Sequence, residues 1–321
     1  MAAVGVTLRA GRDVAGLATL TLANERLRLT ILPEVGGRVW SLCLLPGDRE
    51  LLWHAPDVAP AVHPPGAGYD DRFAGGWDDL FPSVAPAEAD GFALPDHGEW
   101  WTMPMLAAVE GPGGVPSVPG PDGWAEPEAL SVVLRGTGRA TPHRVEKRVT
   151  LRAGAAAVEV GWRVTNDGDR ALPAVFRLHP AMPVAPGDRF DLPDCVVTVD
   201  PAHSPGLAAG PTRWPFARTL ADEPVDLRLA PADGLRMFTA TELAEGWCAL
   251  TAAADGVGLR LRFDPALLDR VACFADFGGW RGLRTAILEP GVGEPTPGGW
   301  HRIAPGETFA AGVTAEVAGD A

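Results

Sequence analysis

Three short stretches of the sequence place histidine and carboxylate side chains where they could transfer protons. The first is LPDHGEWW, residues 94 to 101, in which His97 follows an acid and precedes two tryptophans. Histidine titrates near neutral pH and a carboxylate can be tuned toward it, so a site that holds both can act as acid and base. The flat faces of Trp100 and Trp101 can stack on the apolar face of a sugar ring. The stretch therefore has the residue types of a sugar site with acid–base chemistry.

The same stretch also has a purely structural interpretation. Asp96 could cap a tight turn, Gly98 could adopt a positive φ, and the two tryptophans could belong to the core. This stretch by itself does not separate the two interpretations.

The second and third stretches, VFRLHPAMPV (175 to 184) and TAILEPGVGEP (285 to 295), each place one such residue directly before a proline. Because proline cannot donate a ladder hydrogen bond, we expect a strand to end at each, with His179 and Glu289 at the rim of a sheet. A histidine at a strand end is commonly structural, and a glutamate before Pro-Gly is commonly solvated. Three such sites in one chain, around His97, His179 and Glu289, favour a shared function.

The elements that must position these residues are β-strands. Apolar residues alternate with polar ones in RLRLTIL (26 to 32) and in HRVEKRVTLR (143 to 152), the period-two pattern of a half-buried strand. VEVGWRV, VGLRLRF and TFAAGVTAEV show the same pattern. No long segment free of Pro and Gly has helical periodicity, and 39 Gly and 32 Pro punctuate the chain. We therefore expect an all-β fold of mostly antiparallel strands, a sandwich or barrel, with residues 1 to 321 as one domain.

Residues 54 to 128 interrupt this pattern, because they are rich in Pro, Gly, Asp and Trp and contain few clear strands. So long an irregular segment inside a compact domain is usually either disordered or functional. The aromatic residues Phe73, Trp77 and Phe81 favour a functional, packed segment.

Composition limits the ligands that the chain can bind. A formal charge of −14 repels a phosphate backbone, so we expect no nucleic-acid partner, whereas a neutral sugar is compatible. No apolar run approaches the roughly 18 residues of a membrane helix, so we expect no membrane partner and a cytoplasmic protein. The four cysteines are expected to be buried free thiols rather than disulfides or a zinc site: Cys43, Cys195, Cys248 and Cys273.

The order and spacing of the motifs resemble the aldose 1-epimerases, or galactose mutarotase-like proteins, over nearly the whole chain. The matching stretches are PEVGG (33 to 37), GGWDDLFPS, LPDHGEWW, RLHP, FADFGGW, ILEPGVGEP and the closing HRIAPGETF. The fold that this resemblance implies is a large β-supersandwich with the substrate cleft on its concave sheet.

The resemblance also implies the reaction, which is interconversion of the α and β anomers of a free aldose without metal or organic cofactor. Glu289 would be the base that takes the proton of the anomeric hydroxyl, and His179 the acid that protonates the ring oxygen. His97 would orient the sugar. Further substrate-binding residues would be Arg72, Trp100, Trp101 and Trp280.

Some positions depart from the family pattern. Ala181 and Met182 replace an aromatic pair that commonly follows the acid histidine, which would leave more room in the cleft. Trp101 stands near the position where members acting on sugar phosphates often have an arginine, so we do not expect phosphate recognition. By their place in the order, Asp222 and Asp226 are candidates for a third acidic site residue.

Two other functions stay open. One is a non-catalytic carbohydrate-binding or regulatory module on the same fold, which loss of a proton-transfer residue would mark, whereas His179 and Glu289 are both present. The other is a lyase or hydrolase of glycosidic bonds, but a glycosidase normally needs two facing carboxylates.

Overall fold

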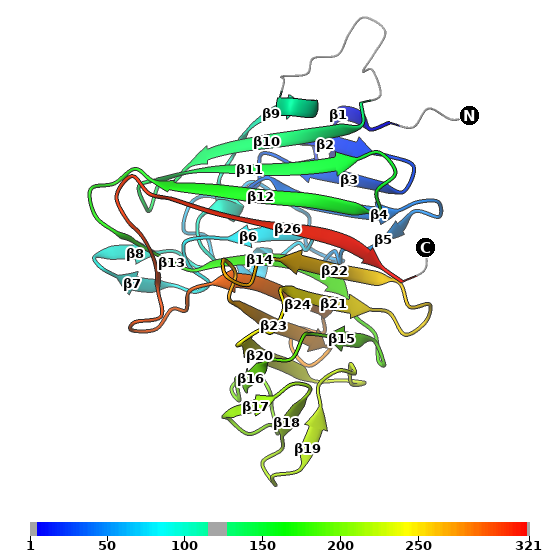
Figure 1. The fold of residues 1–321 in the computed structure, drawn as a ribbon, viewed down its shortest axis with the longest axis vertical. Helices are drawn as coiled ribbons and strands as arrows, with labels where there is room; N and C mark the ends of the chain where they lie inside the picture. The colour runs from blue at the N-terminus through cyan, green and yellow to red at the C-terminus, as the bar shows by residue number, and fades with distance from the viewer. Residues whose placement is uncertain (1–4, 115–126, 320–321) are drawn as a thin grey trace, which may run out of the picture. The chain divides into compact units, whose positions relative to one another are not determined.

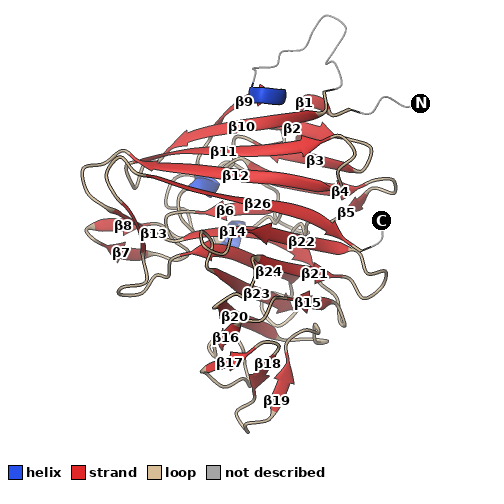
Figure 2. Ribbon diagram, in the orientation of Figure 1, coloured by secondary structure: helices blue, strands red, loops and turns tan. Residues whose placement is uncertain are grey.

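The computed structural model describes residues 5–114 and 127–319 (Figure 1). Strands make up nearly all of its regular structure, and the helical elements among the described residues are short 3₁₀ turns (Figure 2). The expectation of an all-β fold of antiparallel strands is therefore confirmed. The irregular segment between residues 54 and 128 holds short strands and 3₁₀ turns, and its residues 115–126 lie outside the described residues.

The chain divides into two compact units. Unit 1 comprises Met1–Arg177 and Gly293–Thr314, and unit 2 comprises Leu178–Val292 and Ala315–Ala321. His97 belongs to unit 1, whereas His179 and Glu289 belong to unit 2. The expectation of a single domain stays a prediction.

Unit 1 contains two sets of hydrogen-bonded strands. One has the order β1-β2-β3-β4-β6 with β5 beside β4, and the other has the order β26-β12-β11-β10-β9. The elements are β1 Thr7–Val14, β2 Leu17–Ala23, β3 Leu27–Leu32, β4 Arg38–Leu44, β5 Arg49–Glu50, η1 Asp70–Arg72, β6 Trp77–Leu80, β7 Ala87–Ala89, β8 Phe92–Leu94, η2 Trp100–Thr102, β9 Leu106–Glu110, η3 Pro112–Gly114, β10 Ala129–Thr137, β11 His143–Arg152, β12 Ala157–Asn166, β13 Leu172–Ala174, β25 His301–Ile303 and β26 Thr308–Ala318, the last of which continues into unit 2.

The core of unit 1 follows from the alternation of its strands. In β11, Val145, Val149 and Leu151 are buried, as the sequence pattern predicts. Aromatic rings fill the interior around Phe176, whose ring centroid lies 5.3 Å from that of Trp162. This core therefore consists of the inward residues of alternating strands.

Lys147, the only lysine of the chain, shares the buried face of β11. Its Nζ lies 2.6 Å from Oδ2 of Asp79, which also accepts a hydrogen bond from the indole N–H of Trp162 at 2.9 Å. Both ionic side chains are 1% exposed. Burial raises the pKa of Asp79, and the Lys147 ammonium opposes that rise. Unit 1 thus contains an ion pair removed from water.

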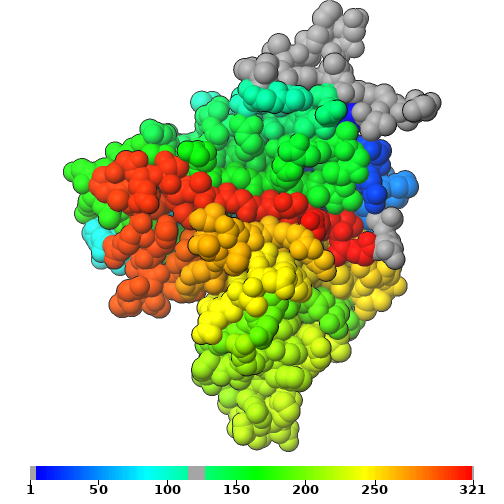
Figure 3. All heavy atoms as spheres, in the orientation of Figure 1, coloured from blue at the N-terminus to red at the C-terminus, as the bar shows by residue number. Residues whose placement is uncertain are grey.

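Unit 2 contains a sheet of order β14-β24-β23-β20-β16-β17 and a second set of order β15-β21-β22. β18 and β19 pair with each other, and the yellow-green segment that holds them lies at the surface (Figure 3). The strands are β14 Phe176–Pro183, which begins at the end of unit 1, β15 Arg189–Asp191, β16 Val196–Val199, β17 Pro211–Arg213, β18 Phe216–Arg218, β19 Pro224–Asp226, β20 Leu235–Thr241, β21 Trp247–Thr251, β22 Gly258–Phe263, β23 Arg270–Phe277 and β24 Arg284–Val292.

The central strands of unit 2 have one core face and one more accessible face. Cys273 of β23 pairs with Phe238 of β20 and Leu288 of β24, and all three are buried. The neighbouring position, Ala272, pairs with Thr239 and Glu289. We call this second face the open face; it carries Met237, Thr239, Ala272, Phe274 and Glu289, of which Met237, Thr239 and Phe274 are half-buried.

All four cysteines are free and buried, and their burial confirms that part of the expectation. No helix among the described residues is long and apolar enough to cross a membrane.

Candidate active site

His179 and Glu289 lie inside β14 and β24 rather than at strand ends. β14 continues past Pro180, and β24 continues past Pro290, which still pairs with Val271 of β23. The side chains of His179 and Glu289 are buried, with 5% and 8% exposed. The expectation that each proline ends its strand and leaves a side chain at the rim is therefore wrong. Each proline removes one ladder donor, and the other bonds of the strand keep it paired.

β14 and β24 are neighbours in the sheet. Two hydrogen bonds show their relative direction. The backbone N–H of Val184 donates to the carbonyl oxygen of Arg284 at 3.4 Å, and Oγ1 of Thr285 donates to the carbonyl oxygen of Met182 at 3.1 Å. Because residue numbers rise along one strand as they fall along the other, the two strands are antiparallel.

His179 precedes Val184 by five residues, and Glu289 follows Arg284 by five residues. We infer from this equal spacing that His179 and Glu289 are opposite each other, with their Cβ atoms about 4.5–5.5 Å apart as in other antiparallel pairs. Opposite residues of an antiparallel pair point to the same face of a sheet, so both side chains belong to the open face of unit 2.

The charge of Glu289 also acts on the adjacent strand β23. Burial raises the pKa of the Cys273 thiol, and the nearby Glu289 carboxylate raises it further. Cys273 is therefore held as a neutral thiol in the core behind the open face.

His97 lies in a tight turn of unit 1 and has a positive φ of 52°. Its Nδ1 lies 2.8 Å from Oδ1 of Asp96, whose other oxygen accepts the backbone N–H of Tyr69 at 2.9 Å. The imidazole stacks on the ring of Tyr69, with centroids 4.0 Å apart. The Asp96 carboxylate favours the tautomer with a proton on Nδ1, in which Nε2 is an acceptor. His97 belongs to unit 1, and its convergence with His179 and Glu289 of unit 2 stays a prediction.

Trp100 and Trp101 are core residues, with 1% and 2% exposed. Because neither ring is exposed, the structure favours the interpretation that both tryptophans belong to the core over stacking on a sugar. Gly98, with φ of 70°, is needed here because a Cβ would lie 2.2 Å from the carbonyl oxygen of Phe81. A Cβ at Gly36 of the PEVGG turn would lie 2.5 Å from the carbonyl oxygen of Trp100. Tight backbone packing on both sides buries the two indoles, as the structural interpretation of LPDHGEWW predicted.

A hydrogen-bonded network that sequence reasoning did not find surrounds Trp100. Its indole N–H donates to Nε2 of His143 at 2.8 Å, and Nδ1 of His143 lies 2.9 Å from Oγ1 of Thr141, which donates to Glu99 at 2.8 Å. Burial lowers the pKa of His143 to about 4, and the Glu99 carboxylate partly opposes that shift. The neutral imidazole is thus a structural link between Trp100 and Glu99.

The remaining predicted binding residues lie in several places. Arg72 is a half-buried residue of unit 1 whose Nη1 donates to the carbonyl of Gly68 at 2.9 Å. Trp280 is a half-buried residue of unit 2 in the turn that follows β23. Asp222 and Asp226 lie on or beside the β18–β19 hairpin; the Asp222 side chain is 89% exposed, and Asp226 is paired with Arg228 at 2.5 Å.

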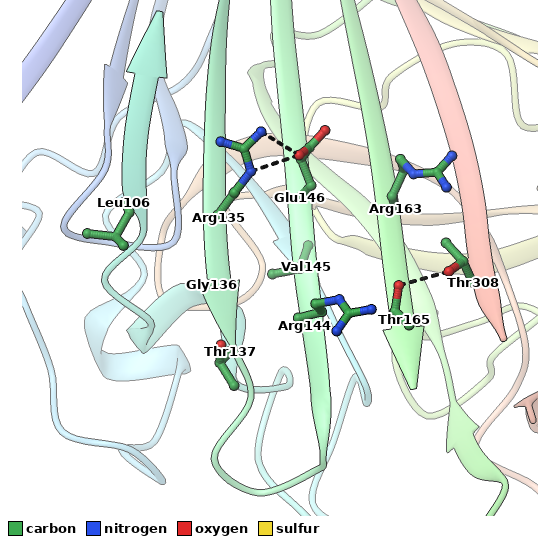
Figure 4. A pocket seen from close by; sticks show the side chains of 10 residues that line it. All are labelled: Leu106, Arg135, Gly136, Thr137, Arg144, Val145, Glu146, Arg163, Thr165 and Thr308. Carbon is green, nitrogen blue, oxygen red and sulfur yellow. Dashed lines mark hydrogen bonds and ion pairs between the residues drawn. The ribbon is translucent and has the colours of Figure 1, made fainter. Parts of the chain in front are cut away.

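A separate hollow of about 550 Å³ lies on the outer side of β9–β12 and β26 in unit 1 (Figure 4). Arg135 pairs there with Glu146 at 2.8 Å, and the hydroxyls of Thr165 and Thr308 are 2.8 Å apart. None of the predicted site residues lines it. Within residues 5–114 and 127–319, no three His, Cys, Asp or Glu side chains gather as they would around a metal ion.

No family model and no curated protein matches this sequence. Solved structures do match its fold. A candidate aldose 1-epimerase from Klebsiella pneumoniae has a TM-score of 0.71 and 15% identity, over 95% of this chain and 80% of that one. A galactose mutarotase-like protein from Clostridium acetobutylicum has a TM-score of 0.63 and 11% identity, over 98% of each chain.

A TPR-domain containing protein from Parabacteroides distasonis also matches, with a TM-score of 0.69 and 14% identity. The match covers 94% of this chain and 47% of that one, so this chain spans about half of that protein's length. The chain therefore has the galactose mutarotase-like fold, as the sequence motifs predicted.

Proposed function

We propose that this chain is an aldose 1-epimerase-like isomerase that interconverts the anomers of a neutral free aldose. The observation that carries the proposal is the equal spacing of His179 and Glu289 from the hydrogen bond that joins their strands. This spacing favours an acid and a base side by side on one face of a sheet. There the two groups can reach two oxygens that are bonded to the same carbon of a ligand.

The chemistry needs that arrangement, because the two reacting oxygens of an aldose are bonded to one carbon. Glu289 takes the proton of the anomeric hydroxyl while His179 gives a proton to the ring oxygen. The bond between the anomeric carbon and the ring oxygen breaks, and an aldehyde forms. After rotation about the adjacent carbon–carbon bond, the two groups reverse their roles and the ring closes. Each general acid or base contributes roughly 10²–10⁴-fold to the rate.

Other features support the proposal and set its substrate class. His97, held by Asp96, would orient the sugar, and Arg72 would bind a hydroxyl. The net charge of −14 favours a neutral sugar over a phosphorylated one. The fold is shared with a candidate aldose 1-epimerase. The buried free cysteines support a location in the reducing cytoplasm.

The experiment is to dissolve crystalline α-D-glucose and α-D-galactose and to follow the return to anomeric equilibrium by polarimetry, with and without the protein. We expect the protein to accelerate the approach to equilibrium for at least one neutral aldose. If it binds these sugars, as measured by calorimetry, and never accelerates the exchange, it is a carbohydrate-binding module instead.

A further inference from the structure

Asp276 lies at the end of β23, at the base of the turn formed by residues 278–283. Its Oδ1 accepts the backbone N–H groups of Gly278 at 2.9 Å and of Trp280 at 3.0 Å. The residue is fully buried, with 0% exposed. Two hydrogen bonds that a buried carboxylate accepts therefore fix the path of the turn that carries Trp280.

The second carboxylate oxygen of Asp276 is buried and has no hydrogen-bond partner. Burial raises the pKa of Asp276, and the backbone N–H donors of the turn oppose that rise. Leaving a buried polar atom unpaired costs free energy. An exposed Asp or Asn could cap a turn without this cost, so the fixed position of this turn is the feature that needs an explanation.

The place of Asp276 in β23 shows which residues lie beside this turn. Asp276 and Phe274 alternate with the core residues of β23, and they share the open face with Ala272, which pairs with Glu289. Phe274 is two residues from Ala272, or about 6.6 Å along the strand. The ring of Trp280 meets Phe274 edge-on, with centroids 5.7 Å apart at 85°. A pair of half-buried rings thus lies next to the proposed base.

The other side of the turn is fixed by Gly234. The backbone N–H groups of Phe277 and Gly279 both donate to its carbonyl oxygen, at 3.0 and 3.2 Å. A Cβ at Gly279 would lie 2.6 Å from the backbone of Gly234, so this approach needs a glycine. Asp276 and Gly234 therefore hold the turn from two sides. Trp280 lies between these contacts and β24 along the chain.

We propose that Asp276 is a positioning residue that holds Trp280 against Phe274, so that the two rings form the aromatic wall on which the apolar face of an aldopyranose rests. Such a face consists of C–H groups and stacks on aromatic rings. The inference rests on the proposed function for the identity of the ligand, but the aromatic wall can be tested by binding alone.

The first test compares Asp276→Ala, Trp280→Ala and the double variant in the anomer-exchange assay. We expect each single change to raise KM about tenfold with kcat within about threefold, because the wall acts in binding. The double variant should be no worse than Trp280→Ala, because Asp276 acts through that ring. Asp276→Asn keeps an acceptor for both N–H groups and should restore a KM near that of the wild type.

The matched control is Asp188→Ala, also in unit 2. Asp188 is buried, and its two oxygens accept the N–H groups of Ala185 at 2.7 Å and Ala253 at 2.9 Å. Its loss should lower the Tm without changing KM. If Asp276→Ala does only the same, or if its effect adds to that of Trp280→Ala, Asp276 is a structural residue and the proposal is overturned.

The second test does not depend on turnover. The eleven tryptophans are replaced by 5-fluorotryptophan, and the ¹⁹F resonance of Trp280 is assigned by its loss in Trp280→Phe. Addition of D-glucose or D-galactose should shift this resonance in the wild type and not in Asp276→Ala. A shift without accelerated exchange would support the aromatic wall and reject the isomerase. Accelerated exchange with no shift at Trp280 would support the isomerase and reject the aromatic wall.

Discussion

His179 and Glu289 stand at equal distances, five residues each, from the backbone hydrogen bond between Val184 and Arg284 that joins β14 to β24. We infer from this spacing that the antiparallel direction of the strands brings toward each other two residues that are 110 positions apart in the chain. Both are carried by strands in the interior of a sheet rather than by loops, and sites built on rigid elements hold their geometry better. This relationship is why an acid–base pair is the best interpretation of the site.

Glu289→Gln should abolish accelerated anomer exchange and leave sugar binding nearly intact. The amide keeps the shape and a hydrogen-bonding oxygen but cannot take a proton, so the rate should fall about 10²-fold or more. Exchange is measured by NMR on a sugar that the wild type accepts, with a binding isotherm beside it. Glu245→Gln, an exposed change in the same unit, is the control and should be silent. Undiminished exchange in Glu289→Gln would remove this residue as the base.

His179→Asn should have a similar effect for the complementary reason. An amide can donate a hydrogen bond to the ring oxygen but cannot deliver a proton to it at neutral pH, so we expect a loss of about 10²-fold or more in kcat. The same NMR assay measures it. The role of His179 as the acid is refuted if the variant keeps its kcat while only its thermal stability changes.

The fold could be predicted from the sequence because its main signals are local. Alternation predicted the strand that spans His143–Arg152 with the observed bounds, and it also predicted its buried face. Lys147 on that face was not predicted to be an interior residue, because its partner Asp79 comes from a distant strand. The sequence pattern of one segment does not indicate which distant segment pairs with it.

The candidate site could be predicted only in its residue types. The Pro after His179 and the Pro after Glu289 indicated strand ends, but the packing of the neighbouring strands outweighs one lost ladder bond each. The roles of Phe274 and Asp276 depend on pairing with β24. The alternation in ACFADF, followed by Gly-Gly, was the sequence pattern that could have indicated these two residues. It identifies them only when the face of the sheet that carries Glu289 is known.

Trp101→Ala should damage stability more than sugar binding. The side chain is 2% exposed, its indole N–H donates to the carbonyl of Asp96 at 3.2 Å, and Tyr69 packs edge-on against it. Removing a buried tryptophan costs about 3–5 kcal/mol in the free energy of unfolding. Urea denaturation measures that loss, and Trp247→Ala, a half-buried position, should cost less. A large loss of sugar affinity with unchanged stability would restore Trp101 as a binding residue.

Lys147→Met should be strongly destabilising, because it leaves the Asp79 carboxylate buried with indole donors and no cation. Breaking a buried ion pair by removing one partner costs about 3–5 kcal/mol. The double variant Lys147→Met with Asp79→Leu should recover part of that loss, since no charge is then left unpaired. Arg135→Met breaks an exposed pair with Glu146 and should cost less than about 1 kcal/mol. Equal urea midpoints for Lys147→Met and Arg135→Met would contradict the buried-charge argument.

The stability of the protein should fall as the pH is lowered from 6.5 toward 4, in part because of His143. Its pKa is about 4 in the folded protein and near the ordinary 6.5 when unfolded, so in this window the unfolded chain binds a proton that the folded chain does not. The contribution of neutral His143 to stability is fully present above pH 6.5. Its loss at low pH approaches about 3 kcal/mol, at roughly 1.4 kcal/mol for each unit of difference in pKa.

The measurement is the free energy of unfolding in urea at pH 7 and pH 4.5. His143→Gln should be less stable than the wild type at pH 7 but should lose less between the two pH values, whereas His203→Gln, at an exposed histidine, should follow the wild type. Parallel losses in the wild type and His143→Gln would show that the acid sensitivity arises from other groups.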